Sequence, residues 1–307
     1  MADVATVAVL AGPAAGHLYV LALDTLVSAV HFPHEAPAAD VAWKSLAVNL
    51  SDLAAMGADP LALQAHCEAP GNDTGWLRDL REGLALAAQA FATPVHVVST
   101  TGAVRRISVQ VLGHVPRDGA LTRAGARAGD DLWVSGTLGD AGAGLALVQG
   151  RLQAAPGAAR EHLLARLARP EPRLALGRAL RGVASAAIDV SDGIVGDAGH
   201  LARRSGVALR IRAHALPISD ALRATADAGA ALDFALRAGD DYELLFCSAP
   251  ADAPAVRAVA AAAGTRVSCI GAAVPGHGVS VRDERGNEVP AGGAYQHFCG
   301  HGRGAGR

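Results

Sequence analysis

The first third of the chain alternates between strand-like and helix-like spacing of its apolar residues. Four apolar runs of strand length occur there, at residues 17–27, 61–69, 94–100 and 105–115. Residues 38–60 and 75–91 instead repeat apolar side chains every three or four positions, which is the period of an amphipathic helix. The order strand, helix, strand, helix, strand, strand predicts an α/β unit that ends near residue 115, with 17–27 as a buried strand that ends near Asp24.

The stretch at 38–60 places two stripes of side chains on one predicted helix, with Asp40 as candidate N-cap and Gly57 as candidate C′ residue. The apolar stripe consists of Trp43, Leu46, Leu50 and Leu53, and the mixed stripe of Ser45, Asn49, Asp52 and Met56. Because the residues between them are mostly apolar, both stripes are expected to face protein. A buried carboxylate is costly, so Asp52 needs a cation, hydrogen-bond donors or a proton, unless it caps a backbone group or lies in water at a cleft edge.

A turn-rich, charged segment at 116–131 separates this unit from a second series of predicted strands and helices. We therefore divide the chain into an N-terminal α/β domain at 1–116, a C-terminal α/β domain at 117–299 and a disordered tail at 300–307. The predicted fold class is α/β (α+β), with two domains.

Composition narrows the class of protein. The 307 residues are 51% hydrophobic but only 4% aromatic, so the core must be built mainly from Ala, Leu and Val. The net charge of −2 implies no strongly basic face, which argues against nucleic acid as a partner. The apolar N-terminus has no basic region and is shorter than the roughly 20 residues of a membrane span, so we expect a cytoplasmic protein with no membrane partner.

Lys44 is the only lysine in the sequence. It does not follow a Gly-rich run of the kind that forms a Walker phosphate loop. If the chain binds a nucleotide, it does so in another way.

Acidic residues gather at the ends of predicted strands. Asp24 and Asp189 lie where strands end, Asp192 at a strand-to-helix turn, and Asp240, Asp241 and Glu243 just before an apolar strand. Ligand sites of open α/β sheets lie at the carboxyl ends of strands, and several carboxylates meeting there favour a hard cation such as Mg²⁺ that also touches substrate phosphates. Two alternatives stay open: Ser191 or Asp192 is an N-cap of the following helix, and the Gly-rich loop at 134–145 serves close packing instead of phosphate binding.

Several motifs occur together and in order along roughly residues 18–298. They are LDTLVSAVHF, KSLAVNLSDLAAMGADP, GALTRAGARAGD, VSGTLGDAGAGL, AIDVSDGI and AGDDYELLF. As a set they resemble thiamine-monophosphate kinase, a member of the larger group that includes aminoimidazole ribonucleotide synthetase and selenophosphate synthetase.

The resemblance implies a two-domain synthetase-like fold whose N-terminal sheet pairs in a homodimer. It implies a magnesium-dependent kinase that uses ATP as co-substrate and phosphorylates thiamine monophosphate to thiamine diphosphate. By position, the metal ligands are Asp24, Asp52, Asp189 and Asp192, with Asp52 and Asp189 also catalytic; the ATP contacts are Arg123, Ser191, Ser99 and Thr100; and the substrate contacts are His31, Asp240 and Tyr295.

The chain departs from the family pattern at two expected aspartate ligands. Val7 stands at one, within VATVAVLAG at 4–12, and Ser99 at the other, within VVSTT at 97–101. The loss of these carboxylates should weaken binding of the metal–nucleotide complex to the protein. An alternative function is therefore a catalytically degenerate paralogue that binds thiamine phosphate or regulates another protein; another synthetase of the same fold with a different acceptor is a third candidate.

Overall fold

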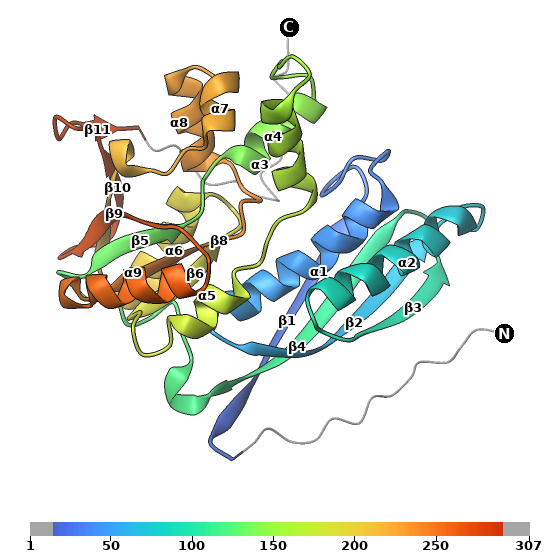
Figure 1. The fold of residues 1–307 in the computed structure, drawn as a ribbon, viewed down its shortest axis with the longest axis horizontal. Coiled ribbons are helices and arrows are strands. Elements are labelled where there is room, and N and C mark those ends of the chain that lie inside the picture. Colours follow the sequence, from blue (N-terminus) through green and yellow to red (C-terminus); the bar gives the residue numbers. More distant parts are fainter. Residues whose placement is uncertain (1–14, 291–307) are drawn as a thin grey trace, which may run out of the picture.

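The computed structural model describes residues 15–290, which form two β-sheets with helices packed on them (Figure 1). The first sheet has the strand order β1-β4-β2-β3 and is antiparallel except for the parallel pair β2–β3. Its strands are β1 (His17–Val27), β2 (Asp59–Ala69), β3 (Val95–Thr101) and β4 (Arg106–Pro116). Each lies within two residues of a run that the apolar pattern predicts.

Helices α1 (Ala38–Ala55) and α2 (Thr74–Ala90) lie side by side along the first sheet (Figure 1). Leu46, Leu50 and Leu53 of α1 are fully buried in its core, as the predicted apolar stripe requires. Helix α1 begins after Pro37, so Asp40 lies in its first turn and is not the N-cap. Gly57 has a φ of +64° and ends the helix as expected.

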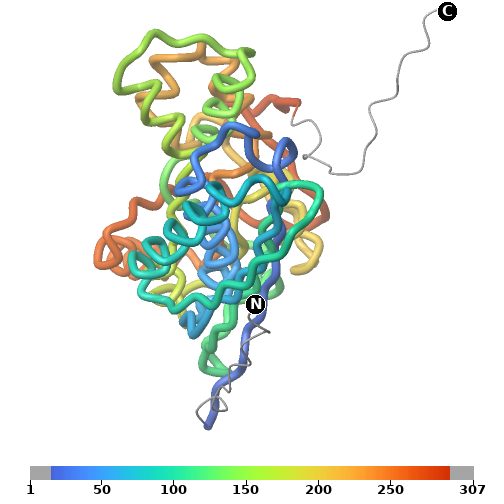
Figure 2. Tube along the Cα trace, turned by 90° about the vertical axis from the view of Figure 1, so that its right-hand side faces the viewer, coloured from blue at the N-terminus to red at the C-terminus, as the bar shows by residue number. Residues whose placement is uncertain are grey.

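Strand β1 differs from the prediction of a buried strand. It pairs only with β4, at one edge of the sheet, and it continues past Asp24 to Val27. Leu21 and Leu23 are 61% and 66% exposed, because their side chains point to the face that α1 and α2 leave uncovered. The start of β1 and the end of β4 project together beyond the rest of the molecule (Figures 1 and 2).

The second sheet has seven strands in the order β11-β10-β7-β9-β5-β8-β6. These are β5 (Asp131–Ser135), β6 (Ala186–Val190), β7 (Ala208–Arg212), β8 (Glu243–Ser248), β9 (Val267–Val274), β10 (Gly278–Arg282) and β11 (Glu288–Val289). The helices of this half are α3 (Asp140–Val148), α4 (Ala158–Ala168), α5 (Leu174–Ala179), α6 (Ile194–Ser205), α7 (Asp220–Thr225), α8 (Ala228–Arg237) and α9 (Ala253–Ala262). Every pair is antiparallel except β10–β7.

Helix α1 joins the two halves of the molecule. Its apolar stripe packs on the first sheet, while Ala54 and Ala55 belong to a second core with Leu176 of α5 and Leu244 of β8. A helix held on two sides exposes little of its surface, which explains why both predicted stripes are largely buried.

The chain crosses from the first sheet to the second over residues 117–130, within the predicted boundary segment. This crossing segment is packed: Leu121 is 4% exposed, and the carbonyl of Thr122 accepts a hydrogen bond from Ala187 N–H of β6. The predicted tail at 300–307 lies outside the described residues. Within the part of the chain that the structure describes, no helix is long and apolar enough to cross a membrane.

Candidate active site

Asp24 and Asp52 come from the first sheet and from the helix that covers it. Asp24 lies on β1 and Asp52 in the last turn of α1. The buried Asn49 ties these elements together: its Oδ1 accepts a 3.1 Å hydrogen bond from Asp24 N–H, and its Nδ2 donates to the carbonyl of Ser45 at 3.0 Å. A side-chain hydrogen bond joins the carboxyl groups of Asp52 and Asp24, and it raises the pKa of Asp52 while lowering that of Asp24.

The third carboxylate comes from the second sheet. Asp189, near the end of β6, is 4% exposed and accepts a 2.9 Å hydrogen bond from Ser51 Oγ. Ser51 precedes Asp52 on α1, so this bond brings Asp189 beside the Asp24–Asp52 pair. The structure thus brings together three of the four predicted metal ligands, from both halves of the chain.

Mutual repulsion marks these three groups. Burial, followed by the charges of Asp189 and Asp24, raises the pKa of Asp52 to about 8. Burial also raises the pKa of Asp189. Although Asp24 lies at an exposed edge, desolvation of its carboxylate raises its pKa, and the hydrogen bond with Asp52 and the charge of a protonated His31 only partly oppose this. Arg123 is the chief positive charge acting on Asp52 and Asp189. The cluster therefore has less positive charge around it than its carboxylates call for.

A divalent cation fits this donor set, because carboxylate oxygens are the hard ligands that Mg²⁺ prefers. Among residues 15–290, no three His, Cys, Asp or Glu side chains are arranged so that they could hold a metal ion by themselves. Mg²⁺ commonly takes one or two carboxylates and completes its shell with water and substrate phosphates. The arrangement therefore suits an ion that is bound together with a nucleotide.

The turn after β6 carries Ser191 and Asp192 and is held by an aspartate to which the sequence pattern gave no role. Asp197, in the first turn of α6, is 3% exposed, and its Oδ2 accepts the N–H groups of Ser191 at 3.1 Å and Asp192 at 3.0 Å. Neither Ser191 nor Asp192 is the N-cap, which is Gly193. Asp192 therefore sits on a fixed turn directly after Asp189, and the signal for this was the third aspartate of AAIDVSDGIVGD.

Asp240 lies beside this turn on the loop before β8. Its N–H donates to the carbonyl of Ser191 at 2.9 Å, and its side chain accepts hydrogen bonds from Lys44 Nζ at 3.0 Å and from Tyr242 Oη at 3.1 Å. Asp240 and Tyr242 both have positive φ, 69° and 51°, which is strained for residues with a side chain. Strain of this kind is kept where surrounding contacts fix the loop.

Asp241 and Glu243 do not join the carboxylate cluster. Asp241 Oδ2 accepts Gly139 N–H at 2.8 Å, and burial raises the pKa of Asp241 well above its usual range. Glu243 is fully buried between Arg166 and Arg173, which contact its Oε1 at 2.9 and 2.6 Å. Both acids therefore form contacts within the half of the molecule that contains the second sheet, and not with the carboxylate cluster.

The Gly-rich loop at 134–145 is explained by packing. A Cβ on Gly139 would lie 2.7 Å from the backbone nitrogen of Ala235, and a Cβ on Gly136 would collide with the Glu243 carboxylate. Gly144 similarly faces the backbone of Leu163 without room for a side chain. Of the two interpretations of this loop, close backbone approach is the one that the structure supports.

His31 and Arg123 lie near the cluster. The Nδ1 of His31 accepts a 3.1 Å hydrogen bond from Val27 N–H, and the ring lies near Asp24, where a protonated imidazole would lower the pKa of that carboxyl. Arg123 is an exposed residue of the crossing segment, and its carbonyl accepts a 3.0 Å hydrogen bond from Ser205 Oγ. His31, the predicted substrate contact, and Arg123, the predicted ATP contact, thus both lie next to the carboxylate cluster.

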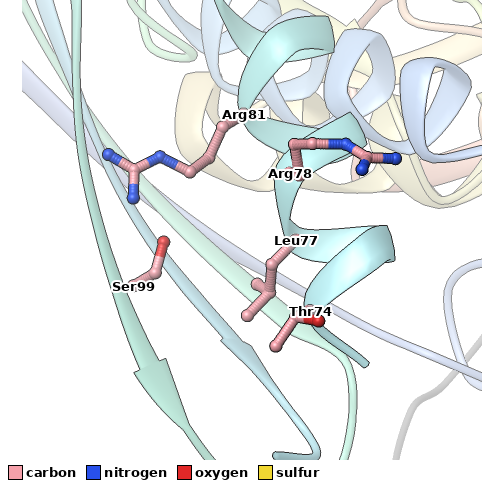
Figure 3. Close-up of a pocket in the computed structure, with 5 residues that line it drawn as sticks. All are labelled: Thr74, Leu77, Arg78, Arg81 and Ser99. Carbon is pink, nitrogen blue, oxygen red and sulfur yellow. The ribbon is translucent and has the colours of Figure 1, made fainter. Parts of the chain in front are cut away.

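Ser99 and Thr100 are not brought to the cluster within one chain. They lie on β3, at the opposite edge of the first sheet from β1. Thr100 Oγ1 bonds His66 Nε2 at 2.9 Å. The buried Ser99 Oγ has no partner within the described residues and faces Arg81 across a cavity of about 430 Å³ (Figure 3). Tyr295 and Val7 lie outside the described residues.

Comparison with known proteins assigns the chain to a family. The family models for AIR synthase related protein match at residues 2–115 (N-terminal domain) and 127–284 (C-terminal domain). The thiamine-monophosphate kinase of Salmonella typhimurium is 41% identical over 251 residues, which are 82% of this chain and 77% of the relative. The chain belongs to the thiamine-monophosphate kinase family. The family member of Caulobacter vibrioides is 38% identical over 274 residues, 86% of this chain and 76% of its own.

Solved structures of the thiamine-monophosphate kinase family agree with this fold. The enzyme from Stenotrophomonas maltophilia K279a superimposes with a TM-score of 0.83 at 44% identity, over 88% of this chain and 86% of that one. AaThiL complexed with AMPPCP and TMP gives a TM-score of 0.82 at 29% identity, over 94% of this chain and 89% of that one. The two-domain synthetase-like fold predicted from the motifs is confirmed.

Proposed function

We propose that this chain transfers the γ-phosphoryl group of ATP to thiamine monophosphate and so forms thiamine diphosphate. The observation that carries the proposal is that Asp24, Asp52 and Asp189, from a strand, a helix and a second sheet, lie close enough to act on one another's pKa between the two halves. The names of the relatives and the AMPPCP and TMP complex of AaThiL support the same substrates.

Mg²⁺ ions would be held by Asp24, Asp52, Asp189 and Asp192. They would supply positive charge that neutralises the nucleotide phosphates, which is most of what phosphoryl transfer asks of a protein besides alignment. The raised pKa of Asp52 and its hydrogen bond to Asp24 support this assignment, because carboxylates in such proximity bind a cation in place of a proton.

The protein's own groups would position the two substrates. Arg123 stands where its guanidinium offers donors to a phosphate beside Asp52 and Asp189. Ser191 lies on the turn fixed by Asp197, and so marks the nucleotide side of the site. Asp240 on its strained loop, with His31 nearby, would receive thiamine monophosphate, as would Tyr295.

The same proposal includes a homodimer formed through the first sheet. Leu21 and Leu23 of β1 and Tyr19 beside them expose apolar surface on the uncovered face. Ser99 and Thr100 lie on the other edge strand of that sheet, so their predicted nucleotide contacts need a second copy of the chain, whose β3 edge would lie beside β1.

A coupled assay of ADP release tests the proposed activity. With Mg²⁺, ATP and thiamine monophosphate, the full chain should release ADP and form thiamine diphosphate, and thiamine without its phosphate should not replace the acceptor. Chelation of Mg²⁺ with EDTA should stop turnover. A chain that binds thiamine monophosphate calorimetrically but releases no ADP would instead be the degenerate, regulatory paralogue that Ser99 and Val7 leave open.

A further inference from the structure

One ion pair of the site joins the two halves of the molecule and involves the sole lysine of the sequence. Lys44, on α1, contacts Asp240 Oδ2 at 3.0 Å. The Lys44 side chain is 6% exposed, whereas that of Asp240 is 32% exposed, so the carboxylate is the partner that solvent and ligands can reach. The hydroxyl of Tyr242 donates to the other oxygen of Asp240 at 3.1 Å.

A buried ammonium group needs a negative partner at all times. Removing a charge from water without compensation costs several kcal/mol. If Asp240 turns toward a positively charged ligand, Lys44 must therefore find another anion within reach. An ammonium is a compact charge with three donors, so it can turn from a carboxylate to a phosphate oxygen without moving its buried stem.

Thiamine monophosphate has the charges that such an exchange requires, since its thiazolium ring is a cation and its phosphate an anion. We propose that the Lys44–Asp240 pair is the recognition element for this zwitterion: on binding, Asp240 pairs with the cationic ring system and Lys44 with the phosphate. This inference rests on the proposed function and adds to it a specificity-determining residue. The pair lowers the affinity for thiamine, because thiamine would pair with Asp240 but has no phosphate for Lys44, whose ammonium would stay buried without an anion.

Binding of both ligands to variants tests the exchange. Calorimetric titration of the wild-type chain should show thiamine monophosphate binding far more tightly than thiamine. Lys44→Met keeps the length of the stem and removes the charge. It should weaken thiamine monophosphate by roughly 10- to 100-fold, the value of a charged hydrogen bond, and strengthen thiamine, because no buried ammonium is then left without an anion. Asp240→Asn should weaken both ligands.

Arg169→Met is the matched control, because Arg169 also pairs with α1, at Asp40, but is 50% exposed and makes its contact away from the carboxylates. It should leave both affinities unchanged. If Lys44→Met weakens the two ligands equally, or neither, the exchange is wrong. If the wild-type chain turns over thiamine monophosphate, and Lys44→Met prefers thiamine monophosphate over thiamine as strongly as the wild type does, this inference alone is overturned. A wild-type chain that does not bind thiamine monophosphate overturns the proposed function as well.

A second measurement needs no variant. Because Lys44 is the only lysine, a chain labelled with ¹³C- and ¹⁵N-lysine and carrying no lysine in its tag gives one side-chain NMR signal. Thiamine monophosphate should move that signal along a saturable curve with the calorimetric Kd. A signal that stays in place when the site is saturated overturns the proposal, even if Lys44→Met does not fold.

Discussion

Asp52 lies between the carboxylates of Asp24, from the first sheet, and Asp189, from the second. It shares a hydrogen bond with Asp24, while its neighbour Ser51 holds Asp189, so the side chains at two successive positions of α1 reach both sheets. Its pKa of about 8 has burial as its first cause and the two other carboxylates as the next. An amide at this position would keep the shape of the side chain but could not ionise to bind a cation, which separates electrostatics from packing.

Asp52→Asn should lower kcat/KM for ATP and thiamine monophosphate by about 100-fold or more, equivalent to ~2.7 kcal/mol of transition-state stabilisation. The reason is that an amide binds a divalent cation less well than a carboxylate. The coupled ADP assay measures this. Asp40→Asn, on the same helix and paired with the half-exposed Arg169, serves as the control and should keep its turnover. Unchanged activity in Asp52→Asn would remove the metal role.

Helix α1 is the element that organises the site. It supplies Lys44, Asn49, Ser51 and Asp52, and it does so while packed against both sheets. A helix fixed on two sides places successive side chains with little freedom, so groups on it keep their positions when ligands come and go. Asn49 extends this order to β1, because its side chain binds the backbone of Asp24.

Asn49→Ala should lower the free energy of unfolding by about 1–3 kcal/mol, because the N–H of Asp24 loses its acceptor. It should also raise the KM for Mg-ATP, since Asp24 is no longer held beside Asp52. Urea unfolding followed by tryptophan fluorescence, together with kinetics, measures the two effects. Thr93→Val removes a buried hydroxyl of the same half, which donates a hydrogen bond to the carbonyl of Phe91. This control should lose stability without the change in KM; equal effects in both would show that Asn49 only supports the fold.

The two halves of the molecule are also joined by charge at the far end of α1. Asp59, at the start of β2, contacts Arg178 of α5 at 3.2 Å and Arg181, just after α5, at 2.6 Å. Partial burial would raise the pKa of Asp59, but the hydrogen bonds and charges of the two arginines outweigh it, and the net result is a lowered pKa. Because the folded state holds the ionised form, this contribution to stability is present above the unfolded pKa near 4 and is lost as the pH falls below it.

Asp59→Asn should therefore lower stability by ~1 kcal/mol or less at pH 7, a small value because the pair is partly in water. The difference from the wild type should shrink as the pH is taken from 4 toward 3. Urea midpoints at pH 7 and pH 3 measure it. Asp79→Asn breaks an exposed contact within α2 and should have no effect at either pH. A wild-type advantage that persists at pH 3 would contradict the ionic origin.

Several particulars of this fold could be predicted from the order of residues alone. The four strands of the first sheet and α1 and α2 follow from apolar spacing, because a strand or helix buries one face through local periodicity. The exposure of β1 could not be predicted in this way, since edge position depends on which strands pair. Likewise, Gly136 and Gly139 pointed equally to phosphate or to packing until their neighbours were known.

The motifs fixed the family and the identity of the carboxylates, because these properties reside in residue types and their local spacing. Folding decided which of those carboxylates meet. Asp189 is more than a hundred residues of chain from Asp24 and Asp52, and the three share a site only because α1 packs between two sheets. Glu243 reads like its neighbour Asp240 in the sequence, yet Arg166 and Arg173 hold it away. The partner of Lys44 was equally invisible, since an ion pair across 196 positions depends on tertiary contacts that local sequence does not encode.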